Sequence, residues 1–223
     1  VIEDWPDREL RILHYDTKHH QERLEAVKSF LERAASFKAN AIAWEIEDKF
    51  AYQKHPLIGA PGAFSAEQLK ELNAFALRRH VELIPIVQGP SHLAFVLKHE
   101  KYAHLREDVN NNYMLCPNKE ESYALLFSMY DELIEATPGA RFFHIGTDEP
   151  YFLGDGIECG CRKQREAIGQ GGMMAEFIAR CAAHLRSRGR SALCWGEHPL
   201  RPQDVARLPE GLINAVYQNP PMS

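Results

Sequence analysis

The sequence predicts an α/β fold with a parallel β-sheet, and three observations support this prediction. Short apolar runs alternate with amphipathic segments along the whole chain, which is the pattern of repeated βα units. The 223 residues, 45% of them apolar, are enough to bury one substantial core. Polar residues recur directly after the apolar runs, where parallel βα folds carry their functional groups. We expect a lead-in segment over residues 1–10 and one domain over residues 11–223.

The first half of the domain contains three predicted strands and two amphipathic helices. Apolar side chains recur at helical spacing over residues 21–37. The next helix begins at Ser65, which has Gln68 three residues later, as in a capping box. The predicted strands are residues 11–16 (RILHYD), 40–46 (NAIAWEI) and 81–87 (VELIPIV).

The second half contains three more strands. A long loop leads to a helix over residues 119–136, and a glycine-rich segment, residues 154–172, is expected to precede a helix over residues 173–188. The predicted strands are residues 141–147, 190–195 and 212–217. Six βα units favour a TIM-type (β/α)8 barrel, which needs about 200 to 250 residues. We therefore expect a barrel whose last two units are missing from this C-terminally incomplete chain, or an open sheet.

Composition excludes several classes of partner. The net charge is -5 and the 26 basic residues are scattered, which argues against nucleic acid or an anionic membrane as a partner. No run approaches the roughly 18 apolar residues of a membrane helix. The five cysteines are odd in number, and Cys159 and Cys161 are too close in sequence for the usual zinc motif. We expect free thiols, no metal and no cofactor, which favours a reducing compartment such as the cytoplasm and leaves the location and the oligomeric state open.

Two adjacent carboxylates, Asp148 and Glu149, follow the fourth predicted strand in the run RFFHIGTDE. In a low dielectric the pKa values of two paired acids move apart, so one acid stays ionised while its neighbour keeps a proton. This arrangement suits acid catalysis. A solvated turn is the alternative, because Pro150 ends strand pairing. Other strand ends carry polar groups as well, and together they predict an active site: Asp16, Lys18 and His19; Glu45, Glu47 and Asp48; Gln88 and His92; His144; Trp195, Glu197 and His198; Tyr217, Gln218 and Asn219.

The absence of two motifs reduces the number of reaction classes that fit the sequence. The segment 169–172 lacks the lysine and hydroxyl of a phosphate-binding loop, and the chain contains no GxSxG element. Histidines around the first strand end, with Asp16, leave a metal-dependent hydrolase as one alternative. Aromatic side chains such as Trp195 and Tyr217, combined with acids and amides, suit a sugar, whose ring has one apolar face and hydroxyl edges.

Several segments resemble glycoside hydrolase family 20, the β-N-acetylhexosaminidases. HIGTDEP is similar to the HxGGDE signature of that family, and four further segments agree in order: NAIAWEIED, VELIPIVQGPSH, LCPNKEESYALL and the strand ending CWGE. The opening VIEDWPDREL is similar to the segment before the catalytic barrel of these enzymes. EIEDKFAY and HIGTDEPYFLG look most like the hexosaminidase D branch.

The resemblance implies substrate-assisted retaining hydrolysis of a terminal N-acetylhexosamine, in which the 2-acetamido oxygen is the nucleophile. It places Glu149 as the general acid and Asp148 as the group that orients the acetamide. Asp48 and His92 correspond to a relay behind the acid, and Trp195 to a wall of the acetamide pocket.

The sequence also departs from the family pattern. Thr147 replaces the second glycine of the signature, and Lys18 or His19 stands where most members have a sugar-binding arginine. We count Asp16, Glu197 and Tyr217 among the substrate-binding residues because they lie at neighbouring strand ends. A tyrosine and a tryptophan of the family pocket belong to strands seven and eight, so a non-catalytic sugar-binding domain is a second alternative.

Overall fold

The computed structural model describes residue 3 and residues 5–196 and 198–216, and it contains one six-stranded parallel sheet. The strands lie side by side in chain order, so each βα unit adds its strand next to the previous one. This confirms the predicted α/β class and the parallel sheet. The strands are β1 (Ile12–Asp16), β2 (Ala41–Glu45), β3 (Glu82–Ile86), β4 (Phe142–His144), β5 (Ser191–Cys194) and β6 (Ile213–Asn214).

The sheet is strongly curled. Adjacent strands lie about 4.8 Å apart, so β1 and β5, four positions apart in the sheet, would be separated by about 19 Å if it were flat. Instead, the ring centroids of His14 on β1 and Trp195 after β5 are only 5.6 Å apart. The inner face is therefore concave, as in a half-barrel, which is consistent with a TIM-type fold. Two further strands outside this chain remain a prediction.

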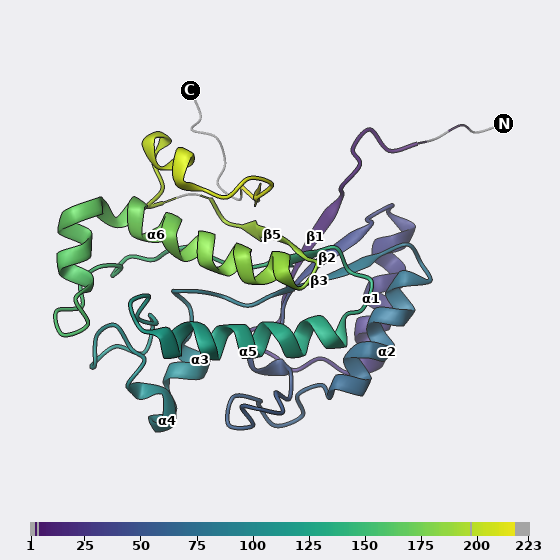
Figure 1. The fold of residues 1–223 in the computed structure, drawn as a ribbon. Helices are drawn as coiled ribbons and strands as arrows, with labels where there is room; N and C mark the ends of the chain where they lie inside the picture. The colour runs from purple at the N-terminus through teal and green to yellow at the C-terminus, as the bar shows by residue number, and fades with distance from the viewer. Residues whose placement is uncertain (1–2, 4, 197, 217–223) are drawn as a thin grey trace.

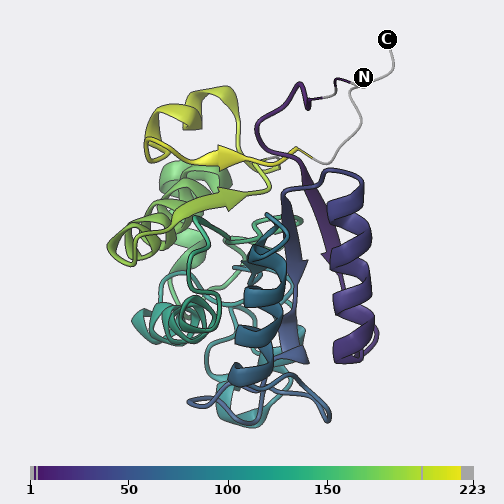
Figure 2. The same ribbon diagram turned by 90° about the vertical axis from the view of Figure 1, so that its right-hand side faces the viewer.

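The long helices form a single layer outside the sheet (Figures 1 and 2). Helix α1 packs against α2, α2 against α5, and α5 against α6. In a doubly wound fold successive helices would be divided between the two faces, whereas a barrel keeps all of them outside. The helices are α1 (Leu24–Ser36), α2 (Ala66–Leu77), α3 (Ala94–Leu97), α4 (Glu100–Ala103), α5 (Glu120–Ala136) and α6 (Cys161–Ser187), with 3₁₀ turns η1 (Glu47–Lys49) and η2 (Pro202–Arg207).

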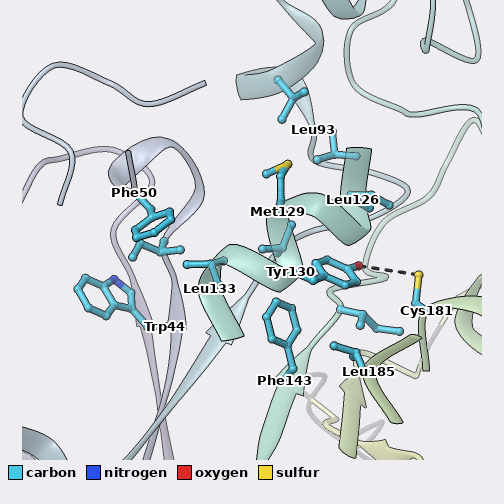
Figure 3. Close-up of a cluster of buried hydrophobic side chains, with 14 of the residues drawn as sticks. Trp44, Phe50, Leu93, Leu126, Met129, Tyr130, Leu133, Phe143, Cys181 and Leu185 are labelled. Carbon is cyan, nitrogen blue, oxygen red and sulfur yellow. Dashed lines mark hydrogen bonds between the residues drawn. The ribbon is translucent and has the colours of Figure 1, made fainter. Parts of the chain in front are cut away.

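The main core lies between the sheet and the helix layer (Figure 3). Tyr130 of α5 is fully buried there, with its ring 4.7 Å from that of Phe143 on β4. Its hydroxyl points to the Cys181 sulfur on α6, 3.8 Å away. These contacts join β4, α5 and α6, so the core fixes the strand that carries the paired acids.

Most predicted elements are confirmed, and two differ in informative ways. The Ser65 cap is present. The backbone nitrogen of Gln68 donates to Ser65 Oγ at 3.2 Å, and the backbone nitrogen of Ser65 donates to Gln68 Oε1 at 2.9 Å. The glycine-rich segment is not a separate linker, because α6 already begins at Cys161 and is only interrupted at Gly169, where φ is 73°. Residues 162–167 (RKQREA) are good helix formers, and they outweigh the glycines around them. The loop after β3 contains the short helices α3 and α4.

No helix in the described part of the chain is long and apolar enough to span a bilayer.

Candidate active site

The paired acids meet a histidine from the neighbouring loop. His92, which follows β3, has its Nε2 atom 3.1 Å from Asp148 Oδ2 and 3.4 Å from Glu149 Oε2. The acids follow β4, the next strand in the sheet. Tyr113 closes the group, because its hydroxyl lies 3.1 Å from His92 Nε2 and donates to the Glu149 carbonyl oxygen at 3.0 Å. Three of the predicted catalytic residues are therefore in direct contact.

The backbone that presents the acids is strained. Gly146, Thr147 and Glu149 have φ angles of 71°, 87° and 52°, in the region that favours glycine. The Thr147 hydroxyl hydrogen-bonds the Trp195 carbonyl oxygen at 3.0 Å, and the Ser91 hydroxyl bonds the Asp148 carbonyl oxygen. Strain of this kind persists only where surrounding contacts enforce it, and it is concentrated at functional sites.

His92 carries a shifted pKa. Burial lowers the pKa of His92, but the hydrogen bond and the charge of Asp148 raise it by more, so the net shift is upward. Asp148 therefore stabilises the charged form of the imidazole relative to a free histidine. Both acids have an oxygen within 3.4 Å of His92 Nε2, so a proton on that nitrogen interacts with both side chains.

A second polar group lies at the end of β2 and centres on Glu45. The Glu45 side chain is only 2% exposed, and its oxygens lie 3.1 Å from His14 Nε2 and 3.1 Å from Lys18 Nζ. Gln88 donates a further hydrogen bond to it. Burial raises the pKa of Glu45, but the bonds from His14 and Gln88 and the Lys18 charge outweigh it and lower the pKa to about 2. Glu45 is therefore a fixed negative charge on the concave face.

His144 and Trp195 form the wall between these two groups. Burial lowers the pKa of His144 to about 3, so its ring is neutral, and its Nδ1 atom accepts a hydrogen bond from the Gly146 nitrogen at 3.0 Å. The rings of His144 and Trp195 are 4.5 Å apart. This places Trp195 beside the loop of the paired acids, as expected for a pocket wall.

The remaining predicted residues divide into three sets. Lys18 pairs with Asp16 at 3.1 Å as well as with Glu45, so its ammonium is engaged at the end of β1, while His19 is exposed. Asp48 pairs with Lys49 and, at 4.0 Å, with Lys98, so the described contacts do not join it to His92. The Asp48 relay stays a prediction. Glu197 and Tyr217 lie outside the described residues.

Sequence reasoning missed Tyr113 and gave Glu45 and Gln88 no specific role in the site. Glu45 and Gln88 stood among the polar strand ends, but only the curled sheet shows that they bond to each other. Tyr113 lies in an asparagine-rich loop, and no sequence signal connects it with His92.

Potential metal ligands gather at a different place from the one considered from the sequence. His14 pairs with Glu45, and His20 pairs with Glu22 at 3.0 Å. Within the described ranges, the one set of three or more potential ligand atoms close enough for a metal is that of Cys116, Cys159 and Cys161.

Comparison with known proteins agrees with this geometry. The profile of "Glycosyl hydrolase family 20, catalytic domain" matches residues 9–219. The chain is 37% identical over 180 residues to hexosaminidase D of Bos taurus, covering 80% of this chain and 52% of that protein. It is 33% identical over 209 residues to hexosaminidase D of Homo sapiens, covering 93% of this chain and 42% of that protein. The chain thus spans about half the length of these relatives.

Solved structures support the fold. A chitobiase from Flavobacterium johnsoniae superimposes with a TM-score of 0.83 at 21% identity, over 97% of this chain and 35% of that one. An exo β-N-acetylglucosaminidase from Vibrio harveyi, solved in complex with N-acetylglucosamine, gives a TM-score of 0.80 at 20% identity, over 97% of this chain and 39% of that one. With the profile match over nearly its whole length, the chain belongs to glycoside hydrolase family 20.

Proposed function

We propose that this chain is the catalytic part of an exo-acting β-N-acetylhexosaminidase that removes terminal N-acetylglucosamine or N-acetylgalactosamine from a glycoconjugate. The family membership supports the reaction class, and the meeting of Asp148, Glu149 and His92 at the concave end of the sheet supports the site. The hexosaminidase D relatives support the substrate class.

One observation carries the assignment of roles. Asp148 Oδ2 contacts His92, whereas Asp148 Oδ1 is buried and has no hydrogen-bond partner among the described residues. A buried carboxylate oxygen without a partner is costly, and an amide N–H of the substrate would satisfy it. The 2-acetamido group of an N-acetylhexosamine supplies such a donor, so Asp148 is suited to orient it.

The reaction then follows in two steps. The acetamide oxygen attacks the anomeric carbon while Glu149, which is 40% exposed at its side chain, gives its proton to the leaving glycosidic oxygen. The bond to the leaving group breaks, and an oxazolinium ion forms whose positive nitrogen faces Asp148. Glu149, now a carboxylate, takes a proton from water as the water oxygen attacks the anomeric carbon, which restores the acetamide and retains the β configuration.

His92 would act through the acids rather than on the sugar. Its Nε2 atom would hold Asp148 in position by the contact at 3.1 Å while Asp148 faces the developing positive charge, and it would fix the position of Glu149 by the contact at 3.4 Å. Trp195 would pack against the acetamide methyl group.

Hydrolysis of aryl N-acetyl-β-hexosaminides tests the proposal. Glu149→Gln is expected to lower kcat by about 10²- to 10⁴-fold on a substrate with a poor leaving group, and far less with a good one, because only the former needs the proton. Asp148→Asn should lower kcat for both substrates. Glu166→Gln, an exposed acid on α6, is the matched control. Turnover of the poor substrate by Glu149→Gln at the wild-type rate contradicts the assignment.

A sugar-binding domain of the same fold is the second candidate. Tight binding of an oxazoline-mimicking inhibitor without any turnover would support this candidate over the enzyme.

A further inference from the structure

Three cysteine side chains from distant parts of the sequence meet beside the active-site loop. Cys116 precedes α5, while Cys159 and Cys161 lie on either side of Gly160 at the start of α6. The Cys116 and Cys161 sulfurs are 3.5 Å apart, and those of Cys159 and Cys161 are 3.0 Å apart. All three sulfur atoms lie within 4.8 Å of one another, and Cys116 and Cys161 are completely buried.

This spacing fits a shared metal ion better than a disulfide. A disulfide requires about 2.05 Å between two sulfurs and leaves the third thiol out. Tetrahedral zinc, with Zn–S bonds of about 2.3 Å, holds its thiolates about 3.8 Å apart. The Cys116–Cys161 distance of 3.5 Å is close to this value, and the Cys159–Cys161 distance of 3.0 Å is shorter. We propose that Cys116, Cys159 and Cys161 bind one zinc ion, because three convergent thiolates favour a soft divalent cation over magnesium or calcium.

Glu107 provides an independent indication of a ligand. Its side chain is buried, with 7% of the residue exposed, and Oε1 accepts hydrogen bonds from the nitrogens of Gly154 at 2.7 Å and Gly156 at 3.2 Å. Oε2 is buried without a hydrogen-bond partner among the described residues. A Cβ atom on Gly156 would lie 2.6 Å from Cys159 Sγ and 2.9 Å from Glu107 Cγ, so both side chains pack on the same glycine. Glu107 therefore lies beside the three cysteines, although its carboxylate oxygens are not among the atoms that lie within 4.8 Å of one another.

An acidic hollow lies beside this cluster. It has a volume of about 430 Å³ and is lined by Glu107 and Gly156, both of which adjoin the cluster. Asp108, Asp155, Glu158 and the single cation Arg162 also line it. The three further acids against one guanidinium give a field that attracts a divalent cation to this side of the cluster.

The ion would anchor the C-terminal end of the loop that follows β4 and carries the paired acids. The chain runs from Glu149 directly to Cys159 and Cys161, and Cys116 lies three residues after Tyr113, which bonds to the Glu149 carbonyl oxygen. Zinc would therefore tie the loop after β4 to the segment whose Tyr113 bonds to Glu149 and His92. This role is structural, and it does not depend on which reaction the acids perform.

Metal analysis of the purified chain tests the proposal directly. The protein is prepared without immobilised-metal resin and dialysed against a weak chelator. We expect it to retain one zinc ion per chain, as measured by inductively coupled plasma mass spectrometry. A thiol-specific mercurial should release this zinc in proportion to modification of the three cysteines, as mapped on peptides. The proposal is overturned if the chain retains no zinc after reconstitution, or if non-reducing peptide mapping finds two of these cysteines joined in a disulfide.

Variants locate the ion. Cys116→Ser and Cys161→Ser should lower the zinc affinity at least about tenfold, and Glu107→Gln by about 10- to 100-fold. Cys181→Ala, which removes a buried thiol that contacts Tyr130, is the control and should keep its zinc. Zinc that is retained equally by all four variants would place the ion elsewhere and refute the site. Because wild-type stoichiometry is measured first, poor folding of a variant leaves the test decisive.

Discussion

Replacing Glu45 by glutamine probes the fixed negative charge on the concave face. The buried carboxylate has ionic contacts at 3.1 Å with His14 and Lys18 and a hydrogen bond from Gln88. Burial by itself would raise the pKa of Glu45, yet these partners lower it from 4.5 to about 2. The ionised form is therefore stabilised by folding.

The magnitude follows from the pKa difference. A fall from 4.5 to about 2 corresponds to about 3 kcal/mol of folding free energy. Because the pKa is lower in the folded state, this contribution is fully present above pH 4.5 and is lost as the pH falls towards 2. Glu45→Gln should therefore be destabilised by about 3 kcal/mol at pH 7, within the range for a broken buried ion pair. The deficit should shrink as the wild-type carboxylate becomes protonated.

Urea unfolding of both proteins at pH 7 and at pH 3 measures this difference. The matched control is Glu22→Gln, since Glu22 pairs with the more exposed His20 and its loss should cost much less. The reasoning is refuted if Glu45→Gln is less than about 1 kcal/mol destabilised at pH 7. It is equally refuted if the deficit is the same at both pH values.

Substitutions at three further positions test the surrounding site. Thr147→Gly and Thr147→Ala both remove the hydroxyl, but only glycine tolerates φ of 87°, so Gly should be the more stable by about 1 kcal/mol in thermal unfolding. Asp148→Asn should bring the pKa of His92 down, because the Asp148 bond and charge raise it, and NMR titration of the ring protons measures this. Burial raises the pKa of Glu47 to about 8, so wild-type stability should fall between pH 4.5 and 8, and Glu47→Gln should flatten that slope.

The sequence predicted the fold well because its signals are local and periodic. All six strands lie within the predicted ranges, since alternation of apolar runs with amphipathic helices is independent of tertiary context. The main error was α6, where glycines at 169, 171 and 172 were weighted above the helix-forming residues before them. β4 is shorter than predicted because the glycine-containing turn after it leaves the sheet early, and β6 is shorter as well.

The site was predicted in part. The part that was not predicted consists of tertiary contacts between residues distant in the sequence. The paired acids and His92 were recognisable because each directly follows a strand. The partners of Asp48 were not, because Lys98 comes from a later loop whose path the sequence does not reveal. For the same reason, sequence spacing did not show that the sulfurs of Cys159 and Cys161 lie close to that of Cys116, which is distant in the sequence.

The positions of the strained residues connect these results. Glu47, His92, Thr147 and Glu149 all have positive φ, and they lie in the loops that follow β2, β3 and β4. Each such residue costs on the order of 1 to 3 kcal/mol, which local sequence preferences do not supply. Contacts between neighbouring loops must offset this cost, as the His92 contacts with both acids and the Thr147 bond to the Trp195 carbonyl oxygen do. The curl of the sheet brings those partners together, so the geometry of the acids depends on the barrel-like fold, and breaking one contact should displace the acids while the strands stay in place.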